Sequence, residues 1–265
     1  MTFNLKKITI ISCILILIVK TSFSDEVKNE GIETNPSDFN TSEYEQQVYD
    51  PLEPLNRAIF KFNNVADRIV LEPVAKGYRK LPSPVQSGVG NFFSNLRLPL
   101  VIVNQFLQGQ FGNAASSTGR LLVNTTIGIG GLIDVADNFG LEEMEEDFGQ
   151  TLATWGMPSG PYIVLPIFGP SNLRDTAGRF ISASTDPVNI YLMDEGEGDI
   201  IIYKTAGNAV EQRARIIDEV NTLRENSVDY YAAVRSSYNQ NRKAQISDRD
   251  DDQLTPVPVI SVEFE

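Results

Sequence analysis

The side chains of this sequence that could carry out chemistry are carboxylates, hydroxyls, lysines, arginines and one cysteine, because the chain contains no histidine. Without imidazole, a Ser–His–Asp triad and histidine-bound metal sites are excluded. The single cysteine, Cys13, lies near the N-terminus, so the rest of the chain has no disulfide, thiolate nucleophile or cysteine-bound metal. A Ser–Lys pair or a pair of carboxylates could still form a catalytic site, but no local motif indicates one. The sequence therefore indicates a protein that is not an enzyme.

Three segments contain part of the pattern of a known binding loop. Residues 88–90 and 128–131 are glycine-rich, but neither completes G-x-G-x-x-G nor ends in Gly-Lys-Ser/Thr, which favours turns or close packing over phosphate binding. Residues 248–252 are rich in aspartate, as a calcium loop is, but Gln253 stands where that loop needs glycine. A solvated acidic segment is the favoured interpretation there. We expect no metal ion and no cofactor.

Composition and charge narrow the class of protein. The 265 residues include 22 lysines and arginines against 35 acidic residues, a formal net charge of −13. This balance argues against broad binding to nucleic acid, which requires clustered cations. Hydrophobic residues make up 42% of the chain, which is ordinary for a globular protein and too low for a polytopic membrane protein.

The N-terminus has the pattern of an export signal. Lys6 and Lys7 precede an apolar run at residues 8–19, which is too short to span a bilayer. Small residues at Ser22 and Ser24 fit a cleavage site, so residues 1–24 are predicted to be a signal peptide. Two alternatives stay open. Cys13 could carry a lipid instead of being a small apolar residue of the signal, and the segment could remain as an uncleaved anchor.

The remaining chain divides into three parts by composition. Residues 25–49 are polar and predict a disordered leader, residues 50–246 predict a helical domain, and residues 247–265 predict an acidic disordered tail. At the start of the domain, Asp50 is expected to cap a helix of about five turns, because apolar residues then recur every three or four positions up to Ile69.

Further apolar stripes predict about eight to ten helices in an all-α fold, with no clear alternating strand. They are expected after Pro73, from Pro84, over 112–124, from a cap at Ser171, from about 200 to 223, and over 228–238. Residues 99–107 form the most apolar stretch and must lie in the core or in a membrane. Residues 156–170 predict an extended apolar connection. Short, unusually apolar helices in an exported protein suggest contact with lipid.

From Asp50-Pro51-Leu52-Glu53-Pro54-Leu55-Asn56-Arg57 onward, the chain resembles the MlaA/VacJ family of outer-membrane lipid-asymmetry proteins. The most specific motif is Gly128-Ile129-Gly130-Gly131-Leu132-Ile133-Asp134-Val135-Ala136. Further collinear matches lie within residues 50–193, at Asn91–Leu96, Asn104–Gly109, Arg120–Thr125, Asp147–Leu152, Gly160–Tyr162, Leu165-Pro166 and Leu173–Asp175.

The resemblance implies a compact ring-like bundle of short amphipathic helices with a central channel, lying in the inner leaflet of the outer membrane on its periplasmic side. Such a protein removes mislocalised phospholipids from the outer leaflet by retrograde transport and passes them to a periplasmic lipid carrier of the Mla pathway. It thereby maintains lipid asymmetry, associates with a trimeric porin and performs no covalent chemistry.

Candidate site residues for this role fall into two groups. The first borders or gates the channel and comprises Phe62, Asn63, Gly128, Gly130, Gly131 and Asp134. The second offers guanidinium groups to lipid phosphates and comprises Arg57, Arg120, Arg174 and Arg179. For each arginine, an ordinary ion pair is the alternative, and the glycine loop could equally be a static packed turn.

One departure concerns the lipid anchor. Family members are typically lipoproteins, but no cysteine stands near Ser24, and Cys13 lies early in the signal.

The alternative function is a soluble periplasmic helical module that binds lipid or protein without residing in a membrane. A lipid-cleaving enzyme is a third hypothesis.

Overall fold

The computed structural model describes residues 48–247, which belong to a single structural unit of the chain. The predicted signal peptide with Cys13, the leader up to residue 47 and the tail beyond residue 247 lie outside the described residues.

Within this part, the chain is predominantly helical, so the predicted all-α class is confirmed, with one small β-hairpin added. The helical elements are α2 (Glu53–Ala66), the π-helical turn η2 (Asp67–Leu71), α3 (Glu72–Tyr78), α4 (Ser83–Leu107), α5 (Phe111–Thr126), the 3₁₀ turn η3 (Ala136–Phe139), α6 (Phe148–Thr154), α7 (Leu173–Thr185), α8 (Pro187–Asp194), α9 (Gly198–Arg215), α10 (Ile217–Asn226) and α11 (Tyr230–Ser247).

The first helix does not begin as the sequence predicts. Leu52, rather than Asp50, occupies the N-cap of α2, and no side chain within residues 48–247 caps the helix. The Asp50 carboxylate instead accepts hydrogen bonds from Tyr231 at 2.5 Å and from Arg235 at 2.8 Å, both on α11. The cap prediction is wrong because a contact between distant segments takes the carboxylate away from the helix end.

Other boundaries differ from the sequence pattern in small ways. Pro99 lies inside the 25-residue helix α4, so the helix expected from Pro84 and the apolar stretch over 99–107 form one element. The N-cap of α7 is Asn172 rather than Ser171, and its side chain accepts a hydrogen bond from the backbone N–H of Asp175 at 2.7 Å. The helix expected over about 200–223 is divided at Ile216, where the backbone leaves helical geometry.

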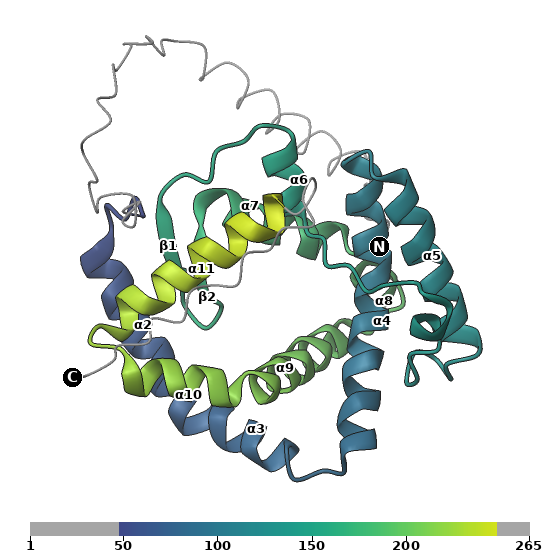
Figure 1. Ribbon diagram of the computed structural model, residues 1–265, viewed down its shortest axis with the longest axis horizontal. Helices are drawn as coiled ribbons and strands as arrows, with labels where there is room; N and C mark the ends of the chain where they lie inside the picture. Colours follow the sequence, from purple (N-terminus) through teal and green to yellow (C-terminus); the bar gives the residue numbers. More distant parts are fainter. Residues whose placement is uncertain (1–47, 248–265) are drawn as a thin grey trace, which may run out of the picture. The chain divides into compact units, whose positions relative to one another are not determined.

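The extended connection contains a short antiparallel hairpin of β1 (Tyr162–Leu165) and β2 (Gly169–Asn172), in which Tyr162 pairs with Asn172. Its tight turn places Ile167 at a φ of 69°, in the left-handed region. The hairpin packs on α2 and α11, so segments from both ends of the described chain meet on it (Figure 1).

Long-range packing brings distant helices together around the middle of this unit. Helix α9 contacts α3 and α4, α5 lies along α4, and α11 contacts α6 and β2. Two small apolar clusters also join segments that are distant in the sequence. Ala75, Ala214 and Ile217 form one small buried cluster, and Tyr162, Val164 and Tyr231 form another.

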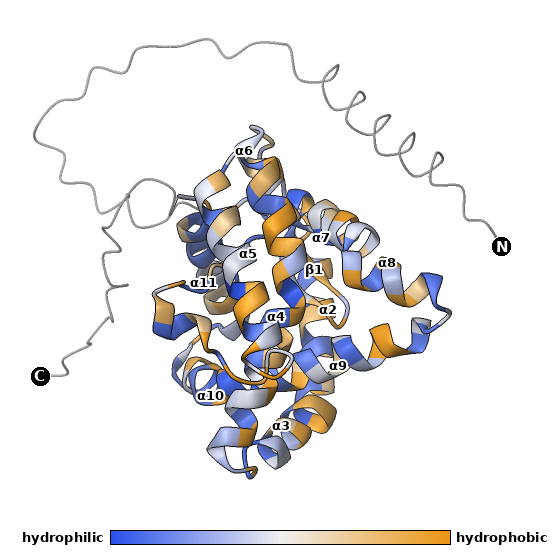
Figure 2. Cartoon of the chain, turned by 90° about the vertical axis from the view of Figure 1, so that its right-hand side faces the viewer, coloured by the Kyte–Doolittle hydropathy of each residue, from blue (hydrophilic) through white to orange (hydrophobic). Residues whose placement is uncertain are grey.

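Polar and apolar side chains are distributed in an unusual way. Asn104, Gln105 and Ser117 are completely buried between α4 and its neighbours, while Phe106 and Phe111 are exposed. Figure 2 shows strongly hydrophobic positions on the outward face of α4 and α5. Exposed large apolar residues continue over the 127–133 loop, the hairpin turn and helices α8 and α9. Within residues 48–247, none of the helices is both long and apolar enough to cross a bilayer.

Candidate functional site

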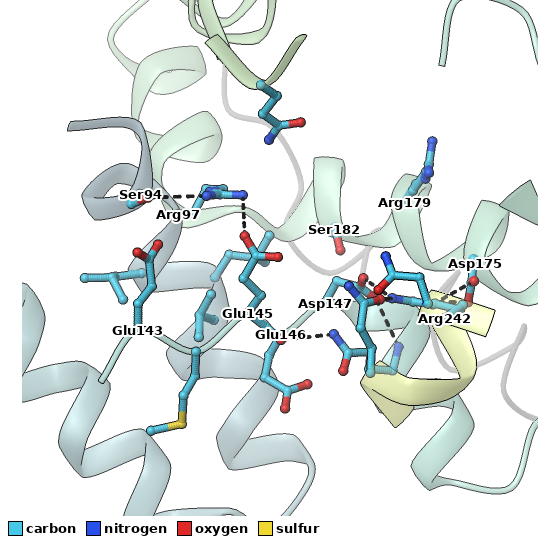
Figure 3. Close-up of a pocket in the computed structure, with 18 of the residues that line it drawn as sticks. Ser94, Arg97, Glu143, Glu145, Glu146, Asp147, Asp175, Arg179, Ser182 and Arg242 are labelled. Carbon is cyan, nitrogen blue, oxygen red and sulfur yellow. Dashed lines mark hydrogen bonds and ion pairs between the residues drawn. The ribbon is translucent and has the colours of Figure 1, made fainter. Parts of the chain in front are cut away.

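A cavity of about 580 Å³ lies among α4, the 143–147 segment, α6, α7, α9 and α11. Three arginines and five acidic residues line it: Arg97, Arg179, Arg242, Glu143, Glu145, Glu146, Asp147 and Asp175. Leu98, Leu100, Val101 and Met144 add an apolar wall from α4 and the neighbouring segment. Figure 3 shows Arg97 beside Glu145, and Arg242 beside Asp147 and Asp175, on different elements around this space. The cavity therefore offers both charged and apolar surface to a ligand.

One corner of the cavity is held by Arg242 of α11. Its guanidinium lies 2.7 Å from the Asp147 carboxylate and 2.8 Å from that of Asp175, and Tyr238 donates a further hydrogen bond to Asp175 at 2.6 Å. Burial alone would raise the pKa of Asp175, but the charge and hydrogen bonds of Arg242 outweigh this effect and lower it. This corner is thus a charged, mutually satisfied joint between α6, α7 and α11.

The close approach of α6 to α7 depends on two glycines. A Cβ at Gly149 would lie 2.5 Å from the Arg242 Nη2, and a Cβ at Gly178 would lie 2.5 Å from the backbone nitrogen of Gly149. Asp147 also caps α6, accepting a hydrogen bond from the N–H of Gln150 at 3.0 Å. The helix end and the cavity corner therefore share one carboxylate.

On the α4 side, Arg97 lies 3.2 Å from the carboxylate of Glu145. Glu143 lies 3.9 Å from Arg120, which is engaged more closely with Asp134. Glu143 and Glu145 therefore each have an arginine within 4 Å.

Arg179 differs from the other two lining arginines. It is exposed and donates to the backbone carbonyls of Phe168 at 3.1 Å and Pro170 at 3.3 Å, and it forms no ion pair within residues 48–247. One turn further along α7, Ser182 also lines the cavity, and its buried hydroxyl has no hydrogen-bond partner in the described part of the chain. Residues three apart share a helix face, so two donors with unused capacity stand together on α7.

The other predicted headgroup arginines are engaged elsewhere. Arg57 pairs with Glu53 at 2.7 Å and Asp229 at 2.6 Å, and the hydrogen bonds that it donates to both carboxylates raise its pKa. Arg120 is buried against Asp134 and the carbonyl of Leu141. Arg174 is buried beside Asp175 at 3.0 Å. Within the described residues, Arg179 is the one of the four that lines the cavity.

The two residues expected to border a channel on the first helix lie near the hairpin. The Asn63 side chain donates to the Leu165 carbonyl at 2.8 Å and accepts from the N–H of Ile167 at 2.7 Å, which fixes the hairpin turn. Phe62 beside it is 57% exposed. Neither belongs to the lining of the cavity.

The predicted gating loop packs against α4. Gly131 has a φ of 89°, and a Cβ there would lie 2.5 Å from the Asn95 Cβ, whereas Gly130 has a φ of 68° and open space around it. A Cβ at Gly128 would lie 2.2 Å from the Ile133 carbonyl. Asp134 closes the loop by accepting hydrogen bonds from Arg120 and Asn124.

Sequence reasoning missed most of the cavity lining, including Ser182, Asp147, Asp175 and Arg242. For Asp147, the available signal is its residue type, because aspartate is a preferred N-cap and Asp147 caps α6. Arg242 is 95 residues from Asp147, so no local pattern could have joined them.

Comparison with known proteins gives consistent matches. The family model described as MlaA lipoprotein matches residues 48–245. A Rickettsia typhi protein, named only as uncharacterized, is 35% identical over 88% of this chain and 93% of its own length. The "Intermembrane phospholipid transport system lipoprotein MlaA" of Escherichia coli is 38% identical over 72% of this chain and 76% of its own length. A solved structure described under "Structural basis for maintenance of bacterial outer membrane lipid asymmetry" has a TM-score of 0.64 and 38% identity, covering 74% of this chain and 98% of that one.

Proposed function

Because the chain belongs to the MlaA lipoprotein family, we propose that it is an outer-membrane component of retrograde phospholipid transport. In this role it removes mislocalised phospholipids from the outer leaflet through the cavity and delivers them to a periplasmic carrier. It is exported, resides on the periplasmic side of the outer membrane, associates with a trimeric porin and carries out no covalent chemistry.

The observation that carries this proposal is the reversed distribution of side chains. Asn104 and Gln105 are buried in α4, whereas Phe106, Phe111 and Leu122 are exposed on α4 and α5. Water disfavours so much apolar surface, but the acyl chains of a bilayer do not. A helical protein can lie in one leaflet through such a surface without spanning the membrane.

Transport of a phospholipid also requires a site for its polar headgroup, and the cavity is suited to this. Its volume of about 580 Å³ lies within the range of pockets that hold small molecules. Arg179 retains N–H donors beyond its two carbonyl contacts, and guanidinium binds phosphate through paired hydrogen bonds. Ser182 supplies a second donor on the same helix face. These two residues are the proposed contact for the lipid phosphate.

The loop from Gly128 to Asp134 is proposed to gate the route that the lipid takes. It rests on α4 through a hydrogen bond from Asn91 to the Leu132 carbonyl at 3.3 Å and through packing on Asn95. Gly130 has open space around it and a backbone conformation that glycine adopts without strain. The loop can therefore change conformation about Gly130 while Asp134 stays anchored to Arg120.

The test is the phospholipid content of the outer leaflet in cells that lack the protein, with and without a complementing copy. Labelling of surface-exposed phosphatidylethanolamine by a membrane-impermeant amine reagent reports that content. We expect accumulation that the complementing copy reverses. Unchanged labelling in cells without a redundant system, together with purification in the absence of detergent, would favour the soluble periplasmic module instead.

A further inference from the structure

The helical stretch from α2 through η2 to α3 is positively charged, unlike the chain as a whole. Residues 58–81 contain five lysines and arginines against two acids, whereas the formal net charge of the chain is −13. The two acids, Asp67 and Glu72, are mostly buried, and both lie within ion-pair distance of Arg213 on α9 and Arg224 on α10. The acids of this stretch therefore face the neighbouring helices and not the outside.

Most of the cations of this stretch have no carboxylate partner. Lys76 pairs with Glu72 at 2.6 Å, and Arg79 pairs with Asp218 at 2.8 Å. The other three are exposed and form no ion pair within residues 48–247: Lys61, Arg68 and Lys80. The outer side of the stretch therefore carries unpaired positive charge at both of its ends and in its middle.

Exposed aliphatic side chains lie between these cations. Four of them are more than half exposed: Val65, Ile69, Val70 and Val74. Val65 follows Lys61 by four residues and precedes Arg68 by three, and residues at these spacings share a helix face. In Figure 1, α3 lies on the outer side of α9, against which it packs. Aliphatic side chains interleaved with long cationic ones are typical of helices that lie in the plane of a membrane interface.

We propose that this outward face of α2, η2 and α3 binds a lipid surface that contains anionic phospholipid. The inference concerns the surrounding leaflet and not the transported lipid, and it rests on the proposed function only for residence in a membrane. Lys61, Arg68 and Lys80 contact lipid phosphates, while the valines and Ile69 reach the acyl boundary. A chain with a net charge of −13 is repelled by an anionic surface as a whole, so contact requires a locally cationic face. The row of exposed aliphatic side chains favours lipid over an acidic protein as the partner.

The test is flotation of the purified full chain with vesicles of phosphatidylcholine, either alone or mixed with phosphatidylglycerol. Each lysine or arginine near an anionic surface strengthens binding about fivefold, so the mixed vesicles should bind the chain at least about tenfold more strongly. The Lys61→Gln/Arg68→Gln/Lys80→Gln variant should lose this preference. Salt at about 1 M should also weaken the preference of the unmodified chain, because it screens exposed charges.

A single-charge comparison controls for the overall charge of the chain. Arg68→Gln and Lys243→Gln each remove one positive charge from an exposed residue, so neither change should unfold the protein. Lys243 lies near the end of α11, which packs on α6 and not on this face. Arg68→Gln should weaken binding to the mixed vesicles about fivefold, and Lys243→Gln should change it by less than about twofold.

Two results would overturn the proposed preference alone. One is equal binding of the unmodified chain to both kinds of vesicle, which would leave an acidic protein as the partner that fits this face. The other is a preference in the triple variant as large as that of the unmodified chain. Absence of binding to either kind of vesicle is a different result, because it would also overturn the membrane residence on which the proposed function depends.

Discussion

The guanidinium of Arg242 lies 2.8 Å from the carboxylate of Asp175, although 67 residues separate them in the sequence. This buried contact joins α11 to α7, and Asp147 extends it to the start of α6. The same three residues line the cavity, so the joint that holds these helices together also shapes the wall that a headgroup would meet.

Removal of Arg242 should strongly destabilise the fold. Arg242→Met leaves Asp175 buried without its main counter-charge, and breaking a buried pair from one side costs about 3–5 kcal/mol. Arg97→Met removes a more exposed pair and should cost no more than about 1 kcal/mol. Denaturant unfolding of the two variants in the same detergent measures the difference, and equal losses would contradict the role assigned to this corner.

Acid should weaken the contact between the first and last helices. Hydrogen bonds from Arg57 lower the pKa of Asp229 to about 2, below the value of about 3.9 in an unfolded chain. The native state therefore binds fewer protons here, and the stabilisation is present above about pH 4 and lost as the pH falls towards 2. The effect is modest because both side chains are partly exposed.

The measurement is the free energy of unfolding against pH for the unmodified chain and for Asp229→Asn. The variant lacks the titrating carboxylate, so its curve should be flatter between about pH 4 and pH 2. Parallel curves would show that Asp229 contributes no acid dependence.

The two glycines of the 127–133 loop should respond differently to alanine. Gly130→Ala should lower the free energy of unfolding by about 1–2 kcal/mol, because alanine disfavours the left-handed backbone conformation at this position. Gly131→Ala has the same unfavourable conformation and also brings its Cβ into a clash with Asn95, which adds about 1–3 kcal/mol. Unfolding of both variants should therefore rank Gly131→Ala as the less stable one. The reverse order would mean that the loop does not rest on α4 as described.

Local sequence patterns could predict much of the fold and little of the site. The helix over 112–124 follows from apolar spacing within a few turns, and the structure places α5 there with an extra residue or two at each end. The cap at Asp50 fails because Tyr231 and Arg235 hold its carboxylate, and those contacts span more than 180 residues.

The cavity depends on the same kind of distant contact. Among the described residues, Ser182 has a buried hydroxyl without a hydrogen-bond partner, which is a property of its surroundings and not of its neighbours in sequence. The sequence alone also cannot assign a role to each arginine, since a guanidinium group can either bind phosphate or form an ion pair. Only packing separates Arg179 from Arg120.

The exposed aromatic face of α4 and α5 should hold the protein to lipid. Phe106 and Phe111 have ring centroids 6.0 Å apart and are both exposed. Burying one such side chain in an apolar phase contributes about 1.5–3 kcal/mol, so Phe106→Ser/Phe111→Ser should weaken partitioning into liposomes at least tenfold. Flotation of the purified chain with vesicles measures this. Phe106→Leu/Phe111→Leu keeps the apolar surface and should float as the unmodified chain does, and equal flotation of both variants would contradict lipid contact at this face.

Arg179 should be required for lipid removal, although its side chain is exposed. Arg179→Gln removes the lining guanidinium that has no carboxylate partner within residues 48–247, so outer-leaflet phospholipid should rise about as it does in cells lacking the protein. Arg179→Lys keeps the charge but loses paired hydrogen bonding to phosphate, and should give partial function.

Arg79→Gln removes the same charge from a surface pair with Asp218 and should behave as the unmodified chain. Since Arg179 is exposed, all three variants should unfold at similar denaturant concentrations. Full lipid removal by folded Arg179→Gln would exclude this residue as the phosphate contact.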